Sequence, residues 1–303
     1  MYDVVIIGGG PGGMTAALYC VRSNLKTLLI EKEMLGGYMA YASVIENYPG
    51  FPDGIKGMEL AQRIAEQVQR TDVDIKYATV KSVDFDSMKI DMGDEQVDAK
   101  TIILSLGLTH KKLEVEGEDT FQGRGVVYCT TCDGPLYRGK KTVVAGKGIP
   151  GITAALYLEE IAESVVLVTP TDELEAKEDI YLDKIFDSSV EVITSAEVKR
   201  LEGSDKLERV VIEYNGDGGS EQVLEADGIF VNIGKKPNTE FLAGTGIDLT
   251  KSGYIRVNDK QETSIKGVYA VGDVTNEKYK QVTTAVGDGC KAALNVARYL
   301  KRH

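Results

Sequence analysis

The chain has 303 residues, 43% of them hydrophobic and 27% charged, with a formal net charge of −12. The length suits about two domains, and the acidic balance argues against nucleic acid as a partner, because phosphate binding needs clustered Lys and Arg. The apolar runs are far shorter than the ~20 residues that span a bilayer, and no signal-peptide pattern precedes the first strand, so we expect a cytoplasmic protein that does not contact a membrane.

The N-terminal segment predicts a dinucleotide site. A hydrophobic strand over Tyr2–Ile7 runs into a glycine-rich turn and a helix through Val21, and a second strand follows over Thr27–Glu31. In this context a Gly-x-Gly-x-x-Gly turn lets a pyrophosphate approach the backbone and the N-terminus of the helix. Glu31 ends the second strand, where an acid can hydrogen-bond a ribose hydroxyl. The turn residues expected to bind the cofactor are Gly8, Gly10, Pro11, Gly12 and Gly13.

A pair of cysteines lies in the middle of the chain, which reads Cys129-Thr130-Thr131-Cys132-Asp133-Gly134. Two cysteines separated by two residues can close a reducible disulfide, and this spacing lowers the pKa of one thiol. The adjacent Asp133 can donate or accept the proton that such an exchange needs. Half of a zinc site and a pair of inert thiols are the other interpretations. Because Cys20 and Cys290 stand alone and the chain has only two histidines, we expect no metal site.

The pattern of strand, glycine turn, helix and strand occurs a second time. A strand over 141–145 leads into Gly146-Lys147-Gly148-Ile149-Pro150-Gly151, and a helix over 153–162 and a strand over 165–168 are expected next. Two such units predict an α/β fold with two Rossmann-like dinucleotide-binding domains. The other expected elements are strands over 101–104, 191–194, 210–213 and 228–233 and a C-terminal helix over 284–301.

A further strand, within 268–274, ends in Gly272-Asp273. A carboxylate at such a strand end can bind a ribityl hydroxyl while the glycine admits a cofactor. Taken alone, this stretch is also compatible with an ordinary junction between a strand and a turn.

These motifs closely resemble the low-molecular-weight, flavin-dependent thioredoxin reductases over essentially the whole chain. The resemblance implies the fold of the FAD/NAD(P)-linked disulfide reductases, with an FAD-binding domain formed by residues 1–110 and 240–303. The inserted NAD(P)-like domain, 111–239, would carry the redox disulfide. The residues that carry the resemblance are the first glycine turn, Gly36-Gly37, Glu46-Asn47-Tyr48-Pro49-Gly50, the cysteine pair, Gly272-Asp273, Lys280-Gln281 and Gly287-Asp288-Gly289-Cys290.

The resemblance also implies FAD as the cofactor, thioredoxin as the electron acceptor and a homodimer. Cys132 would be the sulfur nearer the flavin, whereas the cysteine that attacks thioredoxin stays open. Further contacts to FAD would come from Gly36, Gly37, Tyr38, Asn47, Gly107, Gln281 and Val282.

The segment after the strand over 165–168 departs from the family pattern. Members usually have arginines there that pair with the 2′-phosphate of NADPH, but residues 168–179 contain five acids, one Lys and no Arg. A phosphate dianion would meet repulsion in place of bidentate hydrogen bonds. NADH is not favoured either, because no acid stands at the position of the ribose clamp. We therefore expect a donor other than NADPH, with reduced ferredoxin favoured and NADPH, NADH or a reduced deazaflavin as alternatives.

Two other features concern the electron donor. Tyr38 stands where relatives usually have Gln beside the flavin, so its ring either covers the flavin and obstructs a nicotinamide or packs at the surface. His110-Lys111-Lys112 and Lys235-Lys236 lie at the two expected domain crossings, where they either dock an acidic carrier or are solvated hinge charges.

Two other kinds of protein are alternatives. One is a flavoprotein partner of a peroxiredoxin system. The other is a redox sensor without turnover, against which the intact Cys-x-x-Cys-Asp motif argues.

Overall fold

The computed structural model describes residues 1–42, 44–174, 179–216 and 219–302. Of residues 131, 132, 179 and 180 it describes the backbone but not the side chains. The chain forms two compact units. The first contains Met1–Tyr41, Tyr48–Thr109 and Lys236–His303, and the second contains Ala42–Asn47 and His110–Lys235. The chain crosses between the units at Thr109/His110 and at Lys235/Lys236, and the short segment 42–47 counts with the second unit.

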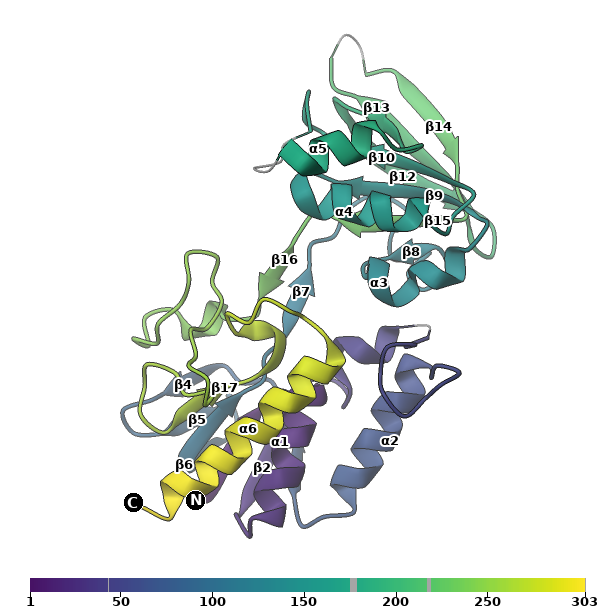
Figure 1. Ribbon diagram of the computed structural model, residues 1–303. Helices are drawn as coiled ribbons and strands as arrows, with labels where there is room; N and C mark the ends of the chain where they lie inside the picture. The colour runs from purple at the N-terminus through teal and green to yellow at the C-terminus, as the bar shows by residue number, and fades with distance from the viewer. Residues whose placement is uncertain (43, 175–178, 217–218, 303) are drawn as a thin grey trace. The chain divides into compact units, whose positions relative to one another are not determined.

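The first unit is built on a seven-stranded sheet with the strand order β3-β2-β1-β6-β5-β4, in which β17 also pairs with β6 (Figure 1). The pairs β1–β2, β2–β3, β1–β6 and β6–β17 are parallel, whereas β4 and β5 are antiparallel additions. The strands are β1 (Tyr2–Ile7), β2 (Thr27–Glu31), β3 (Asp74–Tyr77), β4 (Ser82–Asp84), β5 (Lys89–Asp91), β6 (Gln96–Leu104) and β17 (Val268–Ala270).

The central strands of this sheet are continuous apolar runs, as expected for parallel strands that are covered on both faces. Val4, Val5 and Ile6 of β1 are fully buried. Two of the helices, α1 and α6, pack against each other along the sheet (Figure 1). The helical segments of this unit are α1 (Pro11–Arg22), η1 (Gly37–Tyr41), α2 (Gly57–Gln69), η3 (Glu240–Leu242), η4 (Gly272–Val274) and α6 (Val282–Leu300).

The second unit contains a five-stranded parallel sheet with the order β11-β10-β9-β15-β8 and a separate antiparallel sheet of three strands. The parallel strands are β8 (Val126–Val127), β9 (Lys141–Gly146), β10 (Ser164–Val168), β11 (Glu191–Ile193) and β15 (Gly228–Asn232). The antiparallel strands are β12 (Ala196–Gly203), β13 (Leu207–Tyr214) and β14 (Glu221–Glu225). The helical segments are α3 (Thr130–Asp133), η2 (Gly134–Tyr137), α4 (Gly148–Glu159) and α5 (Asp179–Phe186).

Two helices begin earlier than the sequence pattern predicts. Helix α4 begins at Gly148 and not near Thr153, because Pro150 is tolerated in the first turn, where its missing N–H has no partner to lose. Helix α6 begins at Val282, since the side chains of Gln281 and Thr284 form a capping box. Within the described part of the chain, no helix combines the length and apolar character needed to cross a bilayer.

The two crossings form a short ribbon of two strands, β7 (Leu108–His110) and β16 (Lys235–Pro237). At one end, the backbone N–H of Lys111 donates to the Gly234 carbonyl at 3.0 Å. The two lysine-containing crossings are thus hydrogen-bonded neighbours.

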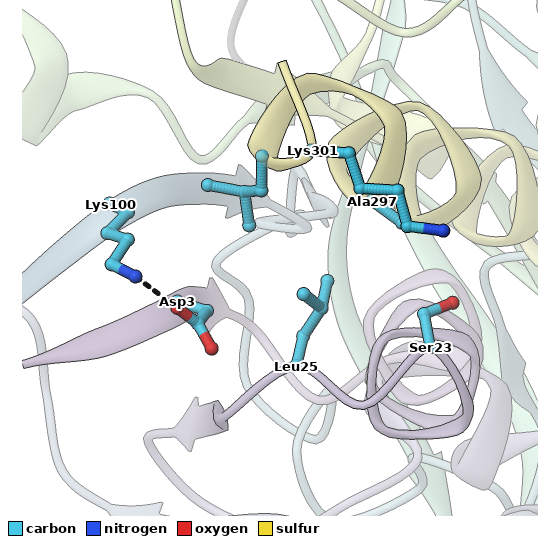
Figure 2. A pocket seen from close by; sticks show the side chains of 7 residues that line it. Asp3, Ser23, Leu25, Lys100, Ala297 and Lys301 are labelled. Atoms are coloured by element: carbon cyan, nitrogen blue, oxygen red, sulfur yellow. Dashed lines mark ion pairs between the residues drawn. The ribbon is translucent and has the colours of Figure 1, made fainter. Parts of the chain in front are cut away.

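A pocket of about 340 Å³ lies at the amino end of β1, where Figure 2 shows Asp3 paired with Lys100. The ion pair spans 2.7 Å, and Asp3 also accepts the backbone N–H of Lys26 at 2.9 Å. These donors hold the pKa of Asp3 below its ordinary value. The pocket is therefore at the opposite end of β1 from the glycine turn.

Candidate functional site

The first glycine turn joins β1 to α1 in a conformation that only small residues allow. Gly8 has a φ of +103°, and a Cβ atom there would lie 2.2 Å from the carbonyl oxygen of Ser105. A Cβ at Gly13 would lie 1.9 Å from the carbonyl oxygen of Gly8. At Gly10, by contrast, a Cβ would meet nothing within 4 Å. The turn is closely packed at its two ends and open at Gly10, directly before α1.

Glu31 lies beside this turn, at the carboxyl end of β2. Its side chain is only 9% exposed. One carboxylate oxygen accepts the backbone N–H of Gly9 at 2.6 Å, and the other accepts that of Glu33 at 3.0 Å. Because β1 and β2 are parallel, their carboxyl ends share one edge of the sheet, which brings Glu31 to the turn.

The short helix η1 packs against the same turn. The backbone N–H of Gly36 donates to a carbonyl of the turn at 2.9 Å, and a Cβ on Gly37 would lie 3.1 Å from the Cα of Gly10. Tyr38 follows directly and is 40% exposed, with its ring centroid 6.1 Å from that of Tyr41. The structure therefore brings the predicted residues Gly36, Gly37 and Tyr38 to the turn.

The Gly272-Asp273 pair approaches the turn from the end of β17. Gly272 has a φ of +72°, and a Cβ there would lie 3.3 Å from the Cβ of Ala285 on α6. A Cβ on Gly12 would lie 3.1 Å from the Ala285 carbonyl oxygen and 3.2 Å from the Val271 side chain. The motifs at the two ends of the chain thus meet in the first unit.

The other predicted cofactor residues occupy different places. Gln281 caps α6 and Val282 is its first residue. Gly107 follows β6 with a φ of +63°, and its carbonyl accepts the backbone N–H of Asn238 at 3.3 Å. Asn47 belongs to the second unit.

This arrangement fits a dinucleotide. The open space at Gly10 admits a phosphate group to the N-terminus of α1, and the Glu31 carboxylate lies beside it. Sequence reasoning missed Ser105 and Ala285, which limit the space at Gly8 and Gly12. Ser105 could have been found, because it directly follows β6 at the same edge of the sheet.

The cysteine pair lies in the second unit, directly after β8. Cys129 is disulfide-bonded, whereas Cys20 and Cys290 are free. A disulfide at Cys129 argues against a zinc ligand and against an inert thiol. The side chain of Cys132 lies outside the described part of the structure. Burial raises the pKa of Cys20 to about 12, which keeps that thiol protonated.

Hydrogen bonds fix the chain on both sides of Cys129. The Asn232 side chain, at the end of β15, donates to the hydroxyl of the buried Thr130 at 3.1 Å. The Tyr128 hydroxyl donates to the Glu118 carboxylate at 2.7 Å. Glu118 is 2% exposed and also accepts two backbone N–H groups at 2.8 and 2.9 Å. The segment that carries the disulfide is therefore anchored by buried polar contacts.

Asp133, the predicted proton-transfer residue, ends helix α3. Its backbone N–H donates to the Cys129 carbonyl at 3.1 Å. Burial raises the pKa of Tyr137 to about 12, and the negative charge of Asp133 adds to this effect.

The second glycine turn keeps its close packing. A Cβ on Gly146 would lie 3.0 Å from the Cα of Gly151 and 3.1 Å from the Asn232 carbonyl oxygen. Gly148 has a φ of +62°. The strand β9 and helix α4 are thus joined by a tight turn, although its Cβ positions have more room than the 1.9 and 2.2 Å found at Gly13 and Gly8 in the first unit.

The segment after β10, where a nucleotide ribose would lie, is bonded to its own unit. The hydroxyl of the fully buried Thr169 lies 2.9 Å from that of Thr171, which donates to the Glu173 carbonyl at 2.7 Å. Asp172 accepts the Ser195 hydroxyl at 2.6 Å. The rest of the acidic run, 175–178, lies outside the described residues. The hydroxyls of Thr169 and Thr171 and one oxygen of Asp172 are therefore already hydrogen-bonded within the second unit.

Comparison with known proteins places the chain in a family. Residues 2–289 match the family described as pyridine nucleotide-disulphide oxidoreductase. The thioredoxin reductase of Bacillus subtilis (strain 168) is 36% identical, with 99% of this chain and 95% of that protein covered.

Two solved structures are similar over their whole length. The thioredoxin reductase of Streptococcus pyogenes MGAS5005 is 37% identical, with 100% of this chain and 99% of that chain covered and a TM-score of 0.93. A ferredoxin-flavin thioredoxin reductase of Clostridium acetobutylicum is 32% identical, with 100% and 99% covered and a TM-score of 0.54. The predicted fold class is confirmed, and the chain belongs to the pyridine nucleotide-disulphide oxidoreductase family as a relative of the thioredoxin reductases, which are FAD-containing oxidoreductases.

Proposed function

We propose that this protein is a thioredoxin reductase that receives its electrons from a donor other than NADPH, with reduced ferredoxin as the favoured donor. The disulfide at Cys129, on an anchored segment of an FAD-linked oxidoreductase, supports the reductase activity. FAD, when bound, supplies the two-electron chemistry that links the donor to this disulfide. By the same resemblance, we propose that the enzyme is a homodimer.

In the proposed reaction, two electrons and two protons open the Cys129–Cys132 disulfide to two thiols. One thiolate then attacks the disulfide of thioredoxin, and a mixed disulfide forms as one thioredoxin thiolate leaves. The second cysteine displaces the thioredoxin sulfur and restores the enzyme disulfide. We assign to Asp133 the transfer of the proton that accompanies thiolate formation.

We assign FAD binding to the cluster around the first glycine turn. Gly10 and the N-terminus of α1 would hold the pyrophosphate, Glu31 a ribose hydroxyl and Asp273 the ribityl chain. Other contacts are assigned to Gly8, Pro11, Gly12, Gly13, Gly36, Gly37, Tyr38, Asn47, Gly107, Gly272, Gln281 and Val282.

The proposal about the electron donor rests on the segment after β10. Recognition of a 2′-phosphate needs cationic side chains, and the sequence has no Arg between Arg138 and Arg200. Thr169 is fully buried and hydrogen-bonded within its own unit, and one oxygen of Asp172 already accepts the Ser195 hydroxyl. The similarity to a ferredoxin-flavin enzyme over the whole chain supports an iron–sulfur protein as the donor.

A pyridine nucleotide is the alternative that one observation favours. Gly146 and Gly151 retain the close packing of a nucleotide-binding turn, which a pyrophosphate could still approach. A reduced deazaflavin is the other alternative, since it needs neither the turn nor the arginines.

Anaerobic mixing of the oxidised enzyme with each donor distinguishes these alternatives. We expect reduced ferredoxin to bleach the flavin absorbance within seconds, and NADPH or NADH at micromolar concentration to leave it unchanged over the same time. Rapid bleaching by NADPH would contradict the proposal.

The positive charge at the crossings is smaller than the sequence alone indicates. Lys112 pairs with Asp119 at 2.6 Å, and Lys236 pairs with Glu240. Each pair offsets one of the four lysine charges that could attract an acidic protein.

His110 also adds no charge to this surface. Burial lowers the pKa of His110 to about 3, and the positive charge of the neighbouring Lys235 adds to this effect. The ring is therefore neutral at physiological pH. Lys111 and Lys235 are exposed, and among the described residues no carboxylate lies within ion-pair distance of Lys111. Lys111 is therefore the strongest of the four candidates for docking an acidic carrier, and Lys235 lies beside it, directly after the Gly234 carbonyl that accepts the Lys111 N–H.

Reversal of both charges in a Lys111→Glu, Lys235→Glu variant is expected to slow flavin reduction by ferredoxin about tenfold at low salt. The difference should shrink at high salt, because ions screen exposed charges. Stopped-flow absorbance measures the rate, and Lys251→Glu, at an exposed lysine of the first unit, is the control. An unchanged rate in the double variant would exclude this docking surface.

A further inference from the structure

A buried acid and a buried amide form a pair that the proposed chemistry does not use. Asp288, on α6, is 5% exposed, and Gln261, in the loop before β17, is 6% exposed. The Gln261 side-chain N–H donates to one Asp288 oxygen, Oδ1, at 3.0 Å. Among the described residues, the other oxygen of each group, Asp288 Oδ2 and Gln261 Oε1, has no hydrogen-bond partner.

The two unpartnered atoms cannot satisfy each other while Asp288 is charged. A carboxylate oxygen and an amide oxygen are both acceptors, and a buried acceptor without a donor costs about 1–3 kcal/mol. A proton on Asp288 changes this, because Oδ2 then becomes a donor. The acid and the amide can then close a ring of two hydrogen bonds, in which both orphaned oxygens take part.

The groups around Asp288 act on its charge in opposite directions. Burial raises the pKa of Asp288, and the negative charge of Glu277 adds to this effect. The Lys291 ammonium, 3.6 Å from Oδ1, and the Gly272 backbone N–H favour the charged form. Lys291 is 56% exposed, so water screens its charge, and the net direction is upward.

The pair joins two elements that frame the candidate cofactor site. On the loop side, the Gln261 carbonyl accepts the backbone N–H of Ala270 at 3.0 Å, two residues before Gly272. On the helix side, Gly289 follows Asp288, and a Cβ there would lie 2.2 Å from the Gly12 carbonyl oxygen. Gln261 also has a φ of +65°, an unfavourable conformation for a residue with a side chain, which a fixed side-chain contact can hold in place.

We propose that Asp288 is protonated in the folded protein and donates its hydrogen to Gln261 Oε1, as a positioning residue that fixes α6 against the strand leading to Gly272-Asp273. The effect on the flavin rests on the proposed FAD site, whereas the protonation itself does not.

The raised pKa of Asp288 makes its contribution to stability decrease as the pH rises. Because the folded state raises the pKa of Asp288, its contribution to stability is fully present below the ordinary aspartate value of 3.8 and is lost as the pH rises through the folded-state value. Carboxyls whose pKa values are lowered, such as Asp3 and Asp84, act in the opposite direction. The effect must therefore be measured as a difference between two variants.

The test compares the wild-type holoenzyme with Asp288→Asn, which keeps the shape and both hydrogen bonds without a titrating proton. Urea denaturation gives the unfolding constant of each protein. The wild-type constant divided by that of Asp288→Asn should rise about tenfold per pH unit above the ordinary aspartate pKa, until the folded-state pKa is reached. Asp259→Asn, which neutralises an exposed acid of the same loop, should not reproduce this dependence. A ratio that stays constant between about pH 4 and about pH 7 would overturn the proposal.

Infrared spectroscopy gives an independent measurement. At about pH 5, above the ordinary aspartate pKa of 3.8, the wild-type protein should show the C=O stretch of a protonated carboxylic acid, which Asp288→Asn removes and Asp259→Asn retains. Absence of that difference band would also overturn the proposal. If the wild type instead binds no FAD, the proposed cofactor site fails, but the infrared band still decides the state of Asp288.

Flavin retention tests the positioning role. Asp288→Ala leaves Gln261 without its partner, so we expect FAD to dissociate about tenfold faster than from wild type. Asp288→Asn should restore the wild-type rate, and equal rates in both variants would contradict a positioning role. Flavin fluorescence after dilution gives the rate.

Discussion

A Cys129→Ser variant is expected to lose thioredoxin reduction by at least about a thousandfold while it still binds FAD and accepts electrons from the donor. Serine cannot form the disulfide that Cys129 makes, so electrons that reach the flavin have no route to thioredoxin. Thioredoxin-dependent reduction of a disulfide dye measures the turnover, and flavin bleaching under anaerobic conditions measures the first step separately.

Cys290→Ser is the matched control for this prediction, because Cys290 is one of the two free cysteines. It makes the same change of sulfur to oxygen outside the disulfide, and its turnover should stay close to wild type. Cys132→Ser should behave like Cys129→Ser. Turnover retained in either variant of the pair would remove the disulfide from the mechanism.

A Gly13→Ala variant is expected to destabilise the first unit by at least about 4 kcal/mol, in the range of the severest single substitutions. The added Cβ would lie 1.9 Å from the Gly8 carbonyl oxygen, and backbone atoms cannot move aside as a side chain can. Urea denaturation followed by circular dichroism measures the change.

Gly10→Ala separates packing from cofactor binding. Its Cβ would meet no protein atom within 4 Å, so the apoprotein should fold with nearly wild-type stability. The methyl group would occupy space assigned to the pyrophosphate, so the affinity for FAD should fall at least about tenfold. Titration of the apoprotein with FAD measures it. Normal affinity in Gly10→Ala would place the phosphates elsewhere.

The first glycine motif could be predicted in detail because its geometry is local. Strand, turn and helix follow one another directly, and a Cβ at Gly13 would meet the Gly8 carbonyl oxygen within that short segment, although the limit at Gly8 comes from the distant Ser105. The position of Glu31 follows from the parallel pairing of β1 and β2. Patterns of this kind leave few alternative arrangements.

The features that escaped prediction depend on distant contacts or on position within a helix. Helix α4 begins at Gly148, before the predicted start at 153, because a proline such as Pro150 is compatible with a first helical turn. The burial of Asp288 could not be read from the sequence, since an acid on a helix is usually exposed. Its partner Gln261 lies on another element, and only the folded chain brings the two together.

The pairing of β17 with β6 has a consequence for how the protein folds (Figure 1). Residues 110–235 separate these two strands and form most of the second unit as one continuous stretch. That stretch can fold on its own during synthesis, before the C-terminal segment is available. The entropic cost of closing so long a loop grows only slowly, by about 0.6 kcal/mol for each doubling of its length.

The last strand of the first unit is therefore added late. Until β17 and α6 join β6 and α1, the glycine turn lacks the contacts of Val271 and Ala285. A nascent chain should thus present one part of the proposed cofactor site well before the other, and the site can be complete only after β17 and α6 have been synthesised.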